Sequence, residues 1–356
     1  MRCKMKIGVR TPLPKFERNT VGNWKSGGSI KCTHVNSENA DVNSYRFKDP
    51  DDAGFKFKPG QHISIRLPLN SGDEYRTFTI CSSPTRVNEI TLTVKTNRPD
   101  GATAWMRDNI RVGSLFSAVG PTGFFNLVDN PCETLLLISA GSGITPMMSM
   151  LRWLWERRDN LDITFIHYAK NSDEYLFSDE LAQINDSYSS LRYHQISTHR
   201  QDNEIYGLPT KKQILSLVDI QDQQVFCCGP TGFMDLVKSI LIQNGLPSEK
   251  YHQESFGSDL IDAPTTPVDQ SADNVIVTFK NKEFEAKPGE KLLSVLKKNQ
   301  VVIPTGCKLG MCGTCQMKLI SGTVDMNHLG GLSDQQIKES IILACCSTLT
   351  ENISVL

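Results

Sequence analysis

The stretch around Cys307 to Cys315 constrains this 356-residue chain more than any other. Cys307, Cys312 and Cys315 follow the pattern C-x4-C-x2-C, and Cys345 comes much later in the chain. Three clustered cysteines and a distant fourth have the ligand spacing of plant-type [2Fe–2S] clusters. Glycines beside these cysteines would let the backbone pass close to the inorganic sulfides. The pattern therefore predicts an iron–sulfur cluster held by these four thiolates, and upstream segments that deliver electrons to it.

Other interpretations of these cysteines stay open at this point. Four cysteines can bind zinc, but zinc sites usually show two short pairs rather than three clustered ligands and a remote one. The cysteines could also be buried thiols without a metal. Because Cys346 directly follows Cys345, either cysteine could be the fourth ligand, and we assign Cys345. We expect His328 to be structural, because a Rieske centre needs a histidine beside a cysteine in each binding segment.

Charge and composition exclude some classes of protein. The net charge of −1 argues against a general affinity for nucleic acid or a membrane surface. In the first thirty-one residues, however, eight Lys or Arg face the single acid Glu17, and we expect residues 1–25 to form a flexible basic tail. No apolar run approaches the roughly 18 residues that span a bilayer, and no signal peptide is evident. Eleven cysteines could suggest disulfides, but four are assigned to the cluster, and an unexported chain lies in a reducing compartment. We therefore expect a cytoplasmic protein.

Short strands with alternating polar and apolar residues dominate residues 26–126. Ile63, Ile65 and Leu67 alternate with polar neighbours, which predicts an antiparallel β-barrel. In the run Arg-Thr-Phe-Thr, Arg76 and Phe78 share one face of a strand. There a guanidinium can clamp a phosphate while the ring stacks on a planar ligand. A solvent-facing strand with one stray Arg is the alternative on this fragment alone.

Residues 127–256 predict an α/β unit with a parallel sheet. Thr134 to Ala140 is a continuous apolar run, typical of a strand buried on both faces. The glycine turn Gly141–Pro146 follows, and then a helix expected over Met147 to Arg158, whose first amides could bind a phosphate. Because Pro146 occupies the sixth position of the turn, the ordinary dinucleotide fingerprint is not met. Further strands are expected at 163–167, 193–197 and 225–228, with a helix near 176–184.

A third unit is expected at the C-terminus. Residues 257–273 are rich in Pro, Ser, Thr and Asp, and predict a linker. In residues 274–356, alternating apolar residues predict a hairpin of strands at 275–279 and 284–286. A helix at about Leu292 to Lys298, the cysteine loop, a segment at 324–328 and a short helix near 334–338 follow.

Taken together, these motifs resemble the ferredoxin–NADP reductase superfamily. The run from Arg76 to Thr79 is similar to its Arg-x-Tyr-(Ser/Thr) flavin motif, the turn at 141–146 to its nicotinamide turn, and Cys228-Gly-Pro to its Cys-Gly-Pro-x-x-Met motif. The hairpin, helix and cysteine loop resemble the β-grasp fold of plant-type ferredoxins. The resemblance implies a multidomain α/β and β fold: a flavin-binding barrel, a nicotinamide-binding α/β domain and a C-terminal ferredoxin-like domain.

The resemblance also implies roles for residues of the flavin motif. Arg76 would bind the flavin phosphate, Phe78 would pack on the isoalloxazine, and Thr79 would lie near N5. The segment from Gly101 to Ala104 resembles the family's pyrophosphate turn but is one residue shorter. We expect Thr103 to cap a helix through about Asn109, and FAD rather than FMN. The expected flavin contacts are Arg76, Thr77, Phe78, Thr79, Ser82, Thr93, Val94, Lys95, Gly101, Thr103, Ala104 and Phe256.

For hydride transfer, the resemblance places Cys228 against the nicotinamide, with Thr79 and Glu254 beside it. The other expected nicotinamide contacts are Gly141, Gly143, Ile144, Thr145, Pro146, Gly229, Pro230 and Met234. We expect NADH, although Arg200 could accept the 2′-phosphate of NADPH.

The order of modules resembles the reductase component of Rieske-type oxygenases that act on glycine betaine and related quaternary ammonium compounds. The reductase of hybrid-cluster protein is the second candidate. Both imply electron flow from NADH through FAD and the [2Fe–2S] cluster to a partner protein. An iron–sulfur redox sensor without turnover is an alternative of another class, but it would need neither Arg76 nor the turn at 141–146.

Overall fold

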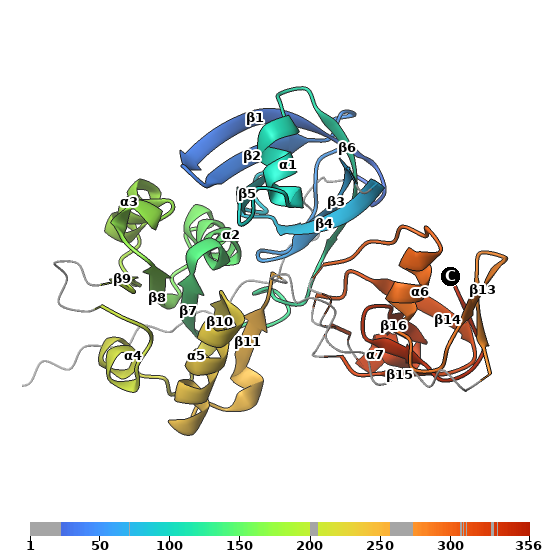
Figure 1. The fold of residues 1–356 in the computed structure, drawn as a ribbon. Helices are drawn as coiled ribbons and strands as arrows, with labels where there is room; N and C mark the ends of the chain where they lie inside the picture. The colour runs from blue at the N-terminus through green and yellow to red at the C-terminus, as the bar shows by residue number, and fades with distance from the viewer. Residues whose placement is uncertain are drawn as a thin grey trace, which may run out of the picture.

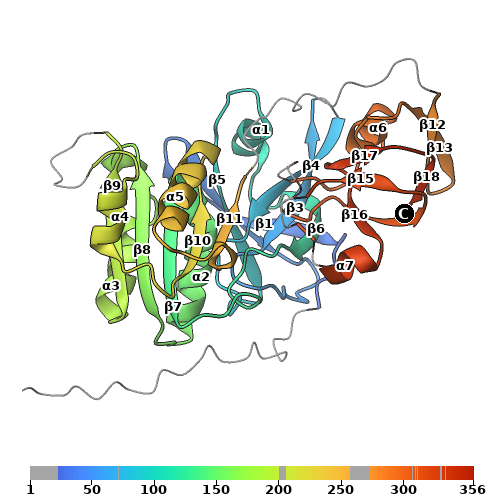
Figure 2. The same cartoon turned by 90° about the horizontal axis from the view of Figure 1, so that it is seen from below.

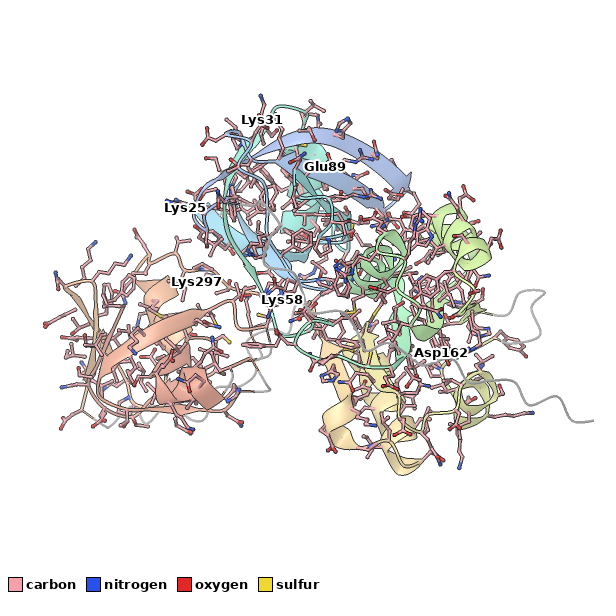
Figure 3. The ribbon with its side chains drawn as sticks, turned by 180° about the vertical axis from the view of Figure 1, so that it is seen from behind. Lys25, Lys31, Lys58, Glu89, Asp162 and Lys297 are labelled. Carbon is pink, nitrogen blue, oxygen red and sulfur yellow. The ribbon has the colours of Figure 1, made fainter. Side chains whose placement is uncertain are left out.

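The computed structural model describes residues 23–70, 72–199, 206–256, 273–306, 308, 310, 312–328, 331–332 and 334–356. They form three units, and the views of Figures 1 and 2 agree that the barrel lies between the parallel-sheet unit and the C-terminal unit. In Figure 3 Lys58 lies near the junction of the units, Asp162 in the parallel-sheet unit and Lys297 in the C-terminal unit. The expected tail and linker lie almost wholly outside the described residues.

The first unit is a six-stranded antiparallel barrel, as the alternation predicts. Its strands, in the order β4-β3-β6-β1-β2-β5, are β1 Ser29–Asn39, β2 Val42–Lys48, β3 His62–Leu69, β4 Gly72–Thr79, β5 Glu89–Lys95 and β6 Leu115–Thr122. Alternate side chains such as Ile30, Phe47, Ile63 and Leu92 meet in a single core, so the sheet curls around them.

Helix α1, Ala102–Asn109, closes one end of the barrel core with Met106. It ends at Asn109 as expected, but the expectation that Thr103 caps it is wrong. Gly101 occupies the N-cap with an extended backbone, and no side chain caps the helix. Thr103 therefore lies inside the first turn, and the helix begins two residues earlier than we expected.

The second unit is a five-stranded parallel sheet in the order β11-β10-β7-β8-β9. Its strands are β7 Thr134–Ala140, β8 Asp162–Ala169, β9 Leu191–Ser197, β10 Gln224–Cys228 and β11 Tyr251–Glu254. Helices α2 Ile144–Glu156 and α3 Ser178–Ser187 pack on one face, and α4 Lys211–Leu217 and α5 Thr231–Gln243 on the other. Three single turns, η1 Gly141–Gly143, η2 Ser172–Glu174 and η3 Ser248–Lys250, complete it.

Helix α2 begins earlier than the sequence indicates. The 3-10 turn η1 runs directly into it at Ile144, so Thr145 lies in the first turn and donates its hydroxyl to the Ser142 carbonyl at 3.1 Å. Pro146 is tolerated there because the amides of a first helical turn have no helical partner. The expected start at Met147 is therefore wrong by three residues.

The C-terminal unit contains the expected hairpin and both expected helices. Its elements are β12 Val275–Phe279, β13 Lys282–Ala286, α6 Leu292–Lys298, β14 Gln316–Ser321, β15 Val324–Met326, α7 Asp334–Lys338, β16 Ile341–Leu343, β17 Ser347–Leu349 and β18 Ile353–Val355. Five strands form a sheet in the order β13-β12-β18-β14-β16, and β15 pairs with β17. Leu292, Val295 and Leu296 of α6 pack into its core.

Within the parts of the chain just described, no helix is both long enough and apolar enough to cross a membrane.

Candidate functional site

Cys228 ends strand β10 on the side of the sheet that faces the barrel. Because side chains alternate along a strand, Cys228 and Cys227 point to opposite faces. Cys228 joins the core that includes Phe125 and Leu127 from the segment after the barrel, whereas Cys227 packs with the residues under α5. Burial raises the pKa of the Cys228 thiol well above its ordinary value. This placement favours Cys228 over Cys227 as the thiol at a site shared with the barrel.

Glu254 joins Cys228 to the barrel. It ends strand β11, and it is the register partner of Cys228 on the neighbouring strand. Its carboxylate accepts a hydrogen bond at 3.4 Å from the hydroxyl of Thr79, the last residue of β4. All three side chains are buried. The structure thus brings together the three residues that we expect at the site of hydride transfer.

The glycine turn at the start of α2 lies directly against the end of β10. A Cβ added to Gly143 would lie 2.2 Å from the Cys228 carbonyl oxygen. No side chain caps α2 at Gly143, and Gly141 has a φ of +54°. The first amides of the helix are therefore not bonded to a capping side chain, which suits the phosphates of a nicotinamide dinucleotide.

Strand β4 presents two different faces to its surroundings. Arg76 and Phe78 share one face: Arg76 is half-exposed and pairs with Glu74 at 2.7 Å, and Phe78 packs against the barrel core. Thr77 lies on the other face, where it contacts the Ser64 hydroxyl at 2.6 Å and donates to the Thr305 carbonyl at 3.0 Å. A half-exposed guanidinium beside a partly exposed ring fits a flavin and its phosphate.

The side chains of several other expected flavin contacts are hydrogen-bonded or buried within the barrel. The hydroxyl of Ser82 accepts from the Thr91 amide at 3.1 Å, Thr93 contacts Ser44 at 2.7 Å, and Val94 and Ala104 are buried. The hydroxyl of Ser82 keeps its own proton to donate to a cofactor. Lys95 pairs with Glu174 of η2 at 2.9 Å, so it links the barrel to the parallel-sheet unit.

The expected nicotinamide contacts also divide into two groups. Gly229 and Pro230 form the turn after Cys228, with Pro230 at the N-cap of α5. Met234, in contrast, packs into the core under α5, on the face opposite Cys228, so the structure does not bring it to the site. Phe256, an expected flavin contact, follows β11 with 43% of its surface exposed.

The described cysteines of the cluster loop lie close together. Cys312 and Cys315 are buried, Cys345 is partly buried, and the Cys345 amide donates to Cys315 Sγ at 3.5 Å. Hydrogen bonds from the thiols of Cys315 and Cys346 lower the pKa of the Cys345 thiol. Cys307 lies outside the described residues. Across those that are described, no three potential ligands converge on one metal ion. An all-sulfur donor set divided between two irons fits a [2Fe–2S] cluster.

Two buried residues at the junctions of the units were not anticipated from the sequence. Arg152 of α2 donates to the Cys81 carbonyl at 2.6 Å and pairs with Glu180 of α3. His62, at the start of β3, contacts residues of both other units. For Arg152 the signal was a charged residue within an apolar helix, whereas no local pattern singles out His62.

Three family models match successive parts of the chain. They are the oxidoreductase FAD-binding domain at residues 29–127, the oxidoreductase NAD-binding domain at 137–239 and the 2Fe-2S iron-sulfur cluster binding domain at 275–350. The fold and these matches define an iron–sulfur flavoprotein oxidoreductase that uses a nicotinamide. The expected FAD, nicotinamide and [2Fe–2S] cluster are confirmed by these matches.

Relatives of known activity match over almost the whole chain. The glycine betaine monooxygenase reductase subunit of Chromohalobacter salexigens is 32% identical, with 96% of this chain and 98% of the relative covered. The stachydrine N-demethylase reductase subunit Stc4 of Rhizobium meliloti is also 32% identical, covering 93% and 97%. NADH oxidoreductase HCR of Escherichia coli is 28% identical over 82% of this chain and 86% of its own.

Among solved structures, phthalate dioxygenase reductase is 25% identical with a TM-score of 0.60, and the match covers 92% of this chain and 97% of that one. The chain belongs to the ferredoxin–NADP reductase superfamily, among the reductases with a C-terminal [2Fe–2S] ferredoxin domain. The expected fold class is confirmed.

Proposed function

We propose that this chain transfers electrons from NADH, through FAD and its cluster, to a Rieske-type oxygenase that acts on a quaternary ammonium compound. The 32% identity to reductase subunits of glycine betaine monooxygenase and stachydrine N-demethylase, over more than nine-tenths of the chain, carries this proposal. Glycine betaine and stachydrine are both quaternary ammonium compounds. Identity of 28% to NADH oxidoreductase HCR supports a second candidate acceptor, hybrid-cluster protein.

Bound FAD would supply the exchange between two-electron transfer from NADH and one-electron transfer to the cluster. In the proposed site Arg76 binds the flavin phosphate, and Phe78 packs on its ring. Thr79 and Cys228 hold the nicotinamide near the flavin, which needs positioning rather than a general base. Burial keeps the Cys228 thiol protonated, so the side chain proposed to contact the nicotinamide is uncharged. Glu254 accepts from Thr79 and fixes the direction of its hydroxyl.

The remaining assignments follow from the same proposal. Cys307, Cys312, Cys315 and Cys345 hold the cluster; of these, Cys312 and Cys315 lie in the described part of the loop before β14, and Cys345 lies in the turn between β16 and β17. We assign residues 26–126, 127–256 and 274–356 to the flavin, nicotinamide and ferredoxin domains, and a cytoplasmic location to the protein. NADH remains our choice over NADPH; Arg200, the residue that would favour NADPH, lies outside the described residues.

An anaerobic stopped-flow experiment tests the proposed acceptor. The protein is reduced with NADH and mixed in turn with a glycine betaine-type Rieske oxygenase and with hybrid-cluster protein, and reoxidation of the cluster is followed by its visible absorbance. Fast reoxidation by the oxygenase alone is the expected result. Fast reoxidation by hybrid-cluster protein alone would replace the proposed acceptor with the second candidate.

A redox sensor without turnover makes a different prediction for the same experiment. A sensor would show no rapid reduction of the cluster by NADH and no reoxidation by either protein. Omitting NADH provides the control, because neither acceptor should then change the absorbance of the oxidised protein.

A further inference from the structure

His62 is buried where the three units of the molecule meet. It is the first residue of β3 in the barrel, with 2% of its surface exposed. Its Nδ1 lies 3.2 Å from a carboxylate oxygen of Glu254, in the parallel-sheet unit. Its Nε2 lies 3.1 Å from the hydroxyl of Thr314, in the cluster loop. One imidazole therefore joins the barrel to both of its neighbours.

These contacts continue in both directions along a single chain of polar groups. On one side Glu254 accepts from Thr79, the residue that we place at the flavin. On the other side the Thr314 hydroxyl lies 3.1 Å from Cys312 Sγ, which we assign as a cluster ligand. His62 thus links the proposed site of hydride transfer to the cluster loop.

Two glycines leave the space that this arrangement needs. A Cβ on Gly123, whose φ is +123°, would lie 2.9 Å from both Nδ1 and Cε1 of His62. A Cβ on Gly306 would lie 3.0 Å from the hydroxyls of both Thr314 and Thr77. Bare backbone at these positions therefore lets the barrel and the cluster loop approach closely. Thr77 uses this approach to donate to the Thr305 carbonyl, a second direct bond between the two units.

A buried histidine makes this docking specific. Burial of a polar ring costs free energy unless both ring nitrogens are bonded, and here the two partners come from different units. The imidazole is satisfied only when both units are in place, so a shifted cluster domain would leave a buried nitrogen without a partner. Burial opposes the charged imidazolium, but the hydrogen bond and the charge of Glu254 outweigh it and raise the pKa of His62.

We infer that His62 is a positioning residue that holds the cluster loop against the flavin-binding barrel at the separation needed for electron transfer from FAD to the cluster. This inference rests on the proposed assignment of Thr79 and Cys312. It concerns transfer within the chain, so it does not depend on which protein finally accepts the electrons.

A pair of substitutions separates the two contacts of His62. In His62→Asn the side-chain amide occupies the region of Nδ1, so it can still bond Glu254 but cannot reach Thr314. In His62→Gln the longer amide reaches the region of Nε2, so it can bond Thr314. A residue that only filled space would tolerate the two amides equally well or equally badly.

The first measurement is anaerobic stopped-flow reduction of the holoprotein by NADH, with flavin bleaching and cluster bleaching followed separately. His62→Asn should slow cluster reduction, relative to flavin reduction, by about tenfold or more, because small displacements of reacting groups have large effects on rate. His62→Gln should recover most of the lost rate of cluster reduction. His34→Asn, at an exposed position on β1, is the matched control and should behave as wild type.

The second measurement, hydrogen–deuterium exchange, does not depend on turnover. In His62→Asn, amides of β4 and of residues 312–316 should exchange faster than in wild type, while those of β8 stay unchanged. Equal cluster-reduction rates and unchanged exchange in both His62 variants would overturn the inference. Failure of the oxygenase to reoxidise the cluster would instead count against the proposed acceptor alone.

Discussion

Gly143 lies against the backbone of Cys228 with no room for a side chain. A Cβ at Gly143 would lie 2.2 Å from the Cys228 carbonyl oxygen and 2.9 Å from the Gly229 amide nitrogen. The turn before α2 and the end of β10 are far apart in the sequence, but they form one continuous surface at the carboxyl edge of the sheet. In the proposed site, nicotinamide binding at that edge needs both segments in place.

Gly143→Ala should therefore separate these two segments. The methyl group meets backbone atoms that cannot rotate away, so we expect a loss of about 1–3 kcal/mol of stability from overpacking and a raised KM for NADH. Denaturant unfolding and steady-state kinetics with ferricyanide would measure the two effects. Gly232→Ala in α5 is the matched control, because its added Cβ meets no atom within 4 Å. Equal stability and KM in the two variants would show that the close approach has no effect.

Glu156 connects the end of α2 to the barrel and should make that connection depend on pH. Its carboxylate lies 2.6 Å from Arg86 and accepts from the Thr85 hydroxyl. Burial raises its pKa, but the hydrogen bonds from Thr85, Ser83 and Arg86 outweigh this, so the pKa lies below its ordinary value of 4.5. The folded state thus favours the carboxylate. Its contribution to stability is present above pH 4.5 and is lost as the pH falls through the lowered pKa.

Unfolding free energies of the wild type and Glu156→Gln between pH 6 and pH 3 would check this prediction. We expect the wild type to be more stable at pH 6 by about 1 kcal/mol or less, because the pair is partly exposed to solvent. The difference should shrink toward pH 3. Glu89→Gln is the control, because the Glu89 carboxylate pairs with Arg46 at 3.8 Å and both residues belong to the barrel. A difference that grew on acidification would contradict the assigned direction.

Elements with strong local patterns could be predicted from the sequence. The strand Thr134–Ala140 and the helix Leu292–Lys298 have the predicted bounds, because burial on both faces leaves a continuous apolar run and burial on one helix face leaves a helical period. The start of α2 could not be predicted, because glycines in the 3-10 turn η1 resemble a loop that ends before a helix. The Thr103 cap failed similarly, since Gly101 adopts the N-cap conformation without a side-chain bond.

The cluster loop could be predicted from the sequence and the contacts of His62 could not, because the loop is local and those contacts are not. Three of the cluster cysteines are local in sequence, so their spacing alone indicates the group they bind. The partners of His62 lie 192 and 252 residues away, and only the packing of three units brings them together. No local pattern in the sequence marks a contact of this kind. The roles of Arg76, Phe78 and Phe256 remain predictions that need experiments.

Arg76→Ala tests the proposed flavin phosphate contact. Loss of a charge-assisted hydrogen bond costs about 1.5–3 kcal/mol, so flavin affinity should fall roughly tenfold or more. The flavin-to-protein ratio after desalting should drop while the iron-to-protein ratio stays constant. Arg66→Ala removes an exposed arginine of β3 that pairs with Asp73 at 2.7 Å, and it should retain both groups. Full retention of flavin in Arg76→Ala would refute the proposed contact.

Cys345→Ser and Cys346→Ser together identify the fourth cluster ligand. The backbone amide of Cys345 bonds Cys315 Sγ at 3.5 Å, and its own thiol shares hydrogen bonds with that cysteine. Cys346 lies buried in the core of the C-terminal unit, where its thiol is 3.7 Å from the Leu343 carbonyl and also within hydrogen-bonding reach of Cys345. We therefore expect Cys345→Ser to lose iron and the visible absorbance of the cluster, and Cys346→Ser to keep both.

Serine at 346 should cost only packing, because a hydroxyl can also donate to the Leu343 carbonyl, and serine is only slightly smaller than cysteine. Iron content, sulfide content and visible circular dichroism of both variants provide the measurement, with flavin content as the internal standard for folded protein. The reverse outcome, iron lost from Cys346→Ser and kept by Cys345→Ser, would move the ligand by one residue. Because residues 344–346 form the turn between β16 and β17, closed by the bond from the Cys346 amide to the Leu343 carbonyl, that shift would require this turn to rearrange when the cluster binds.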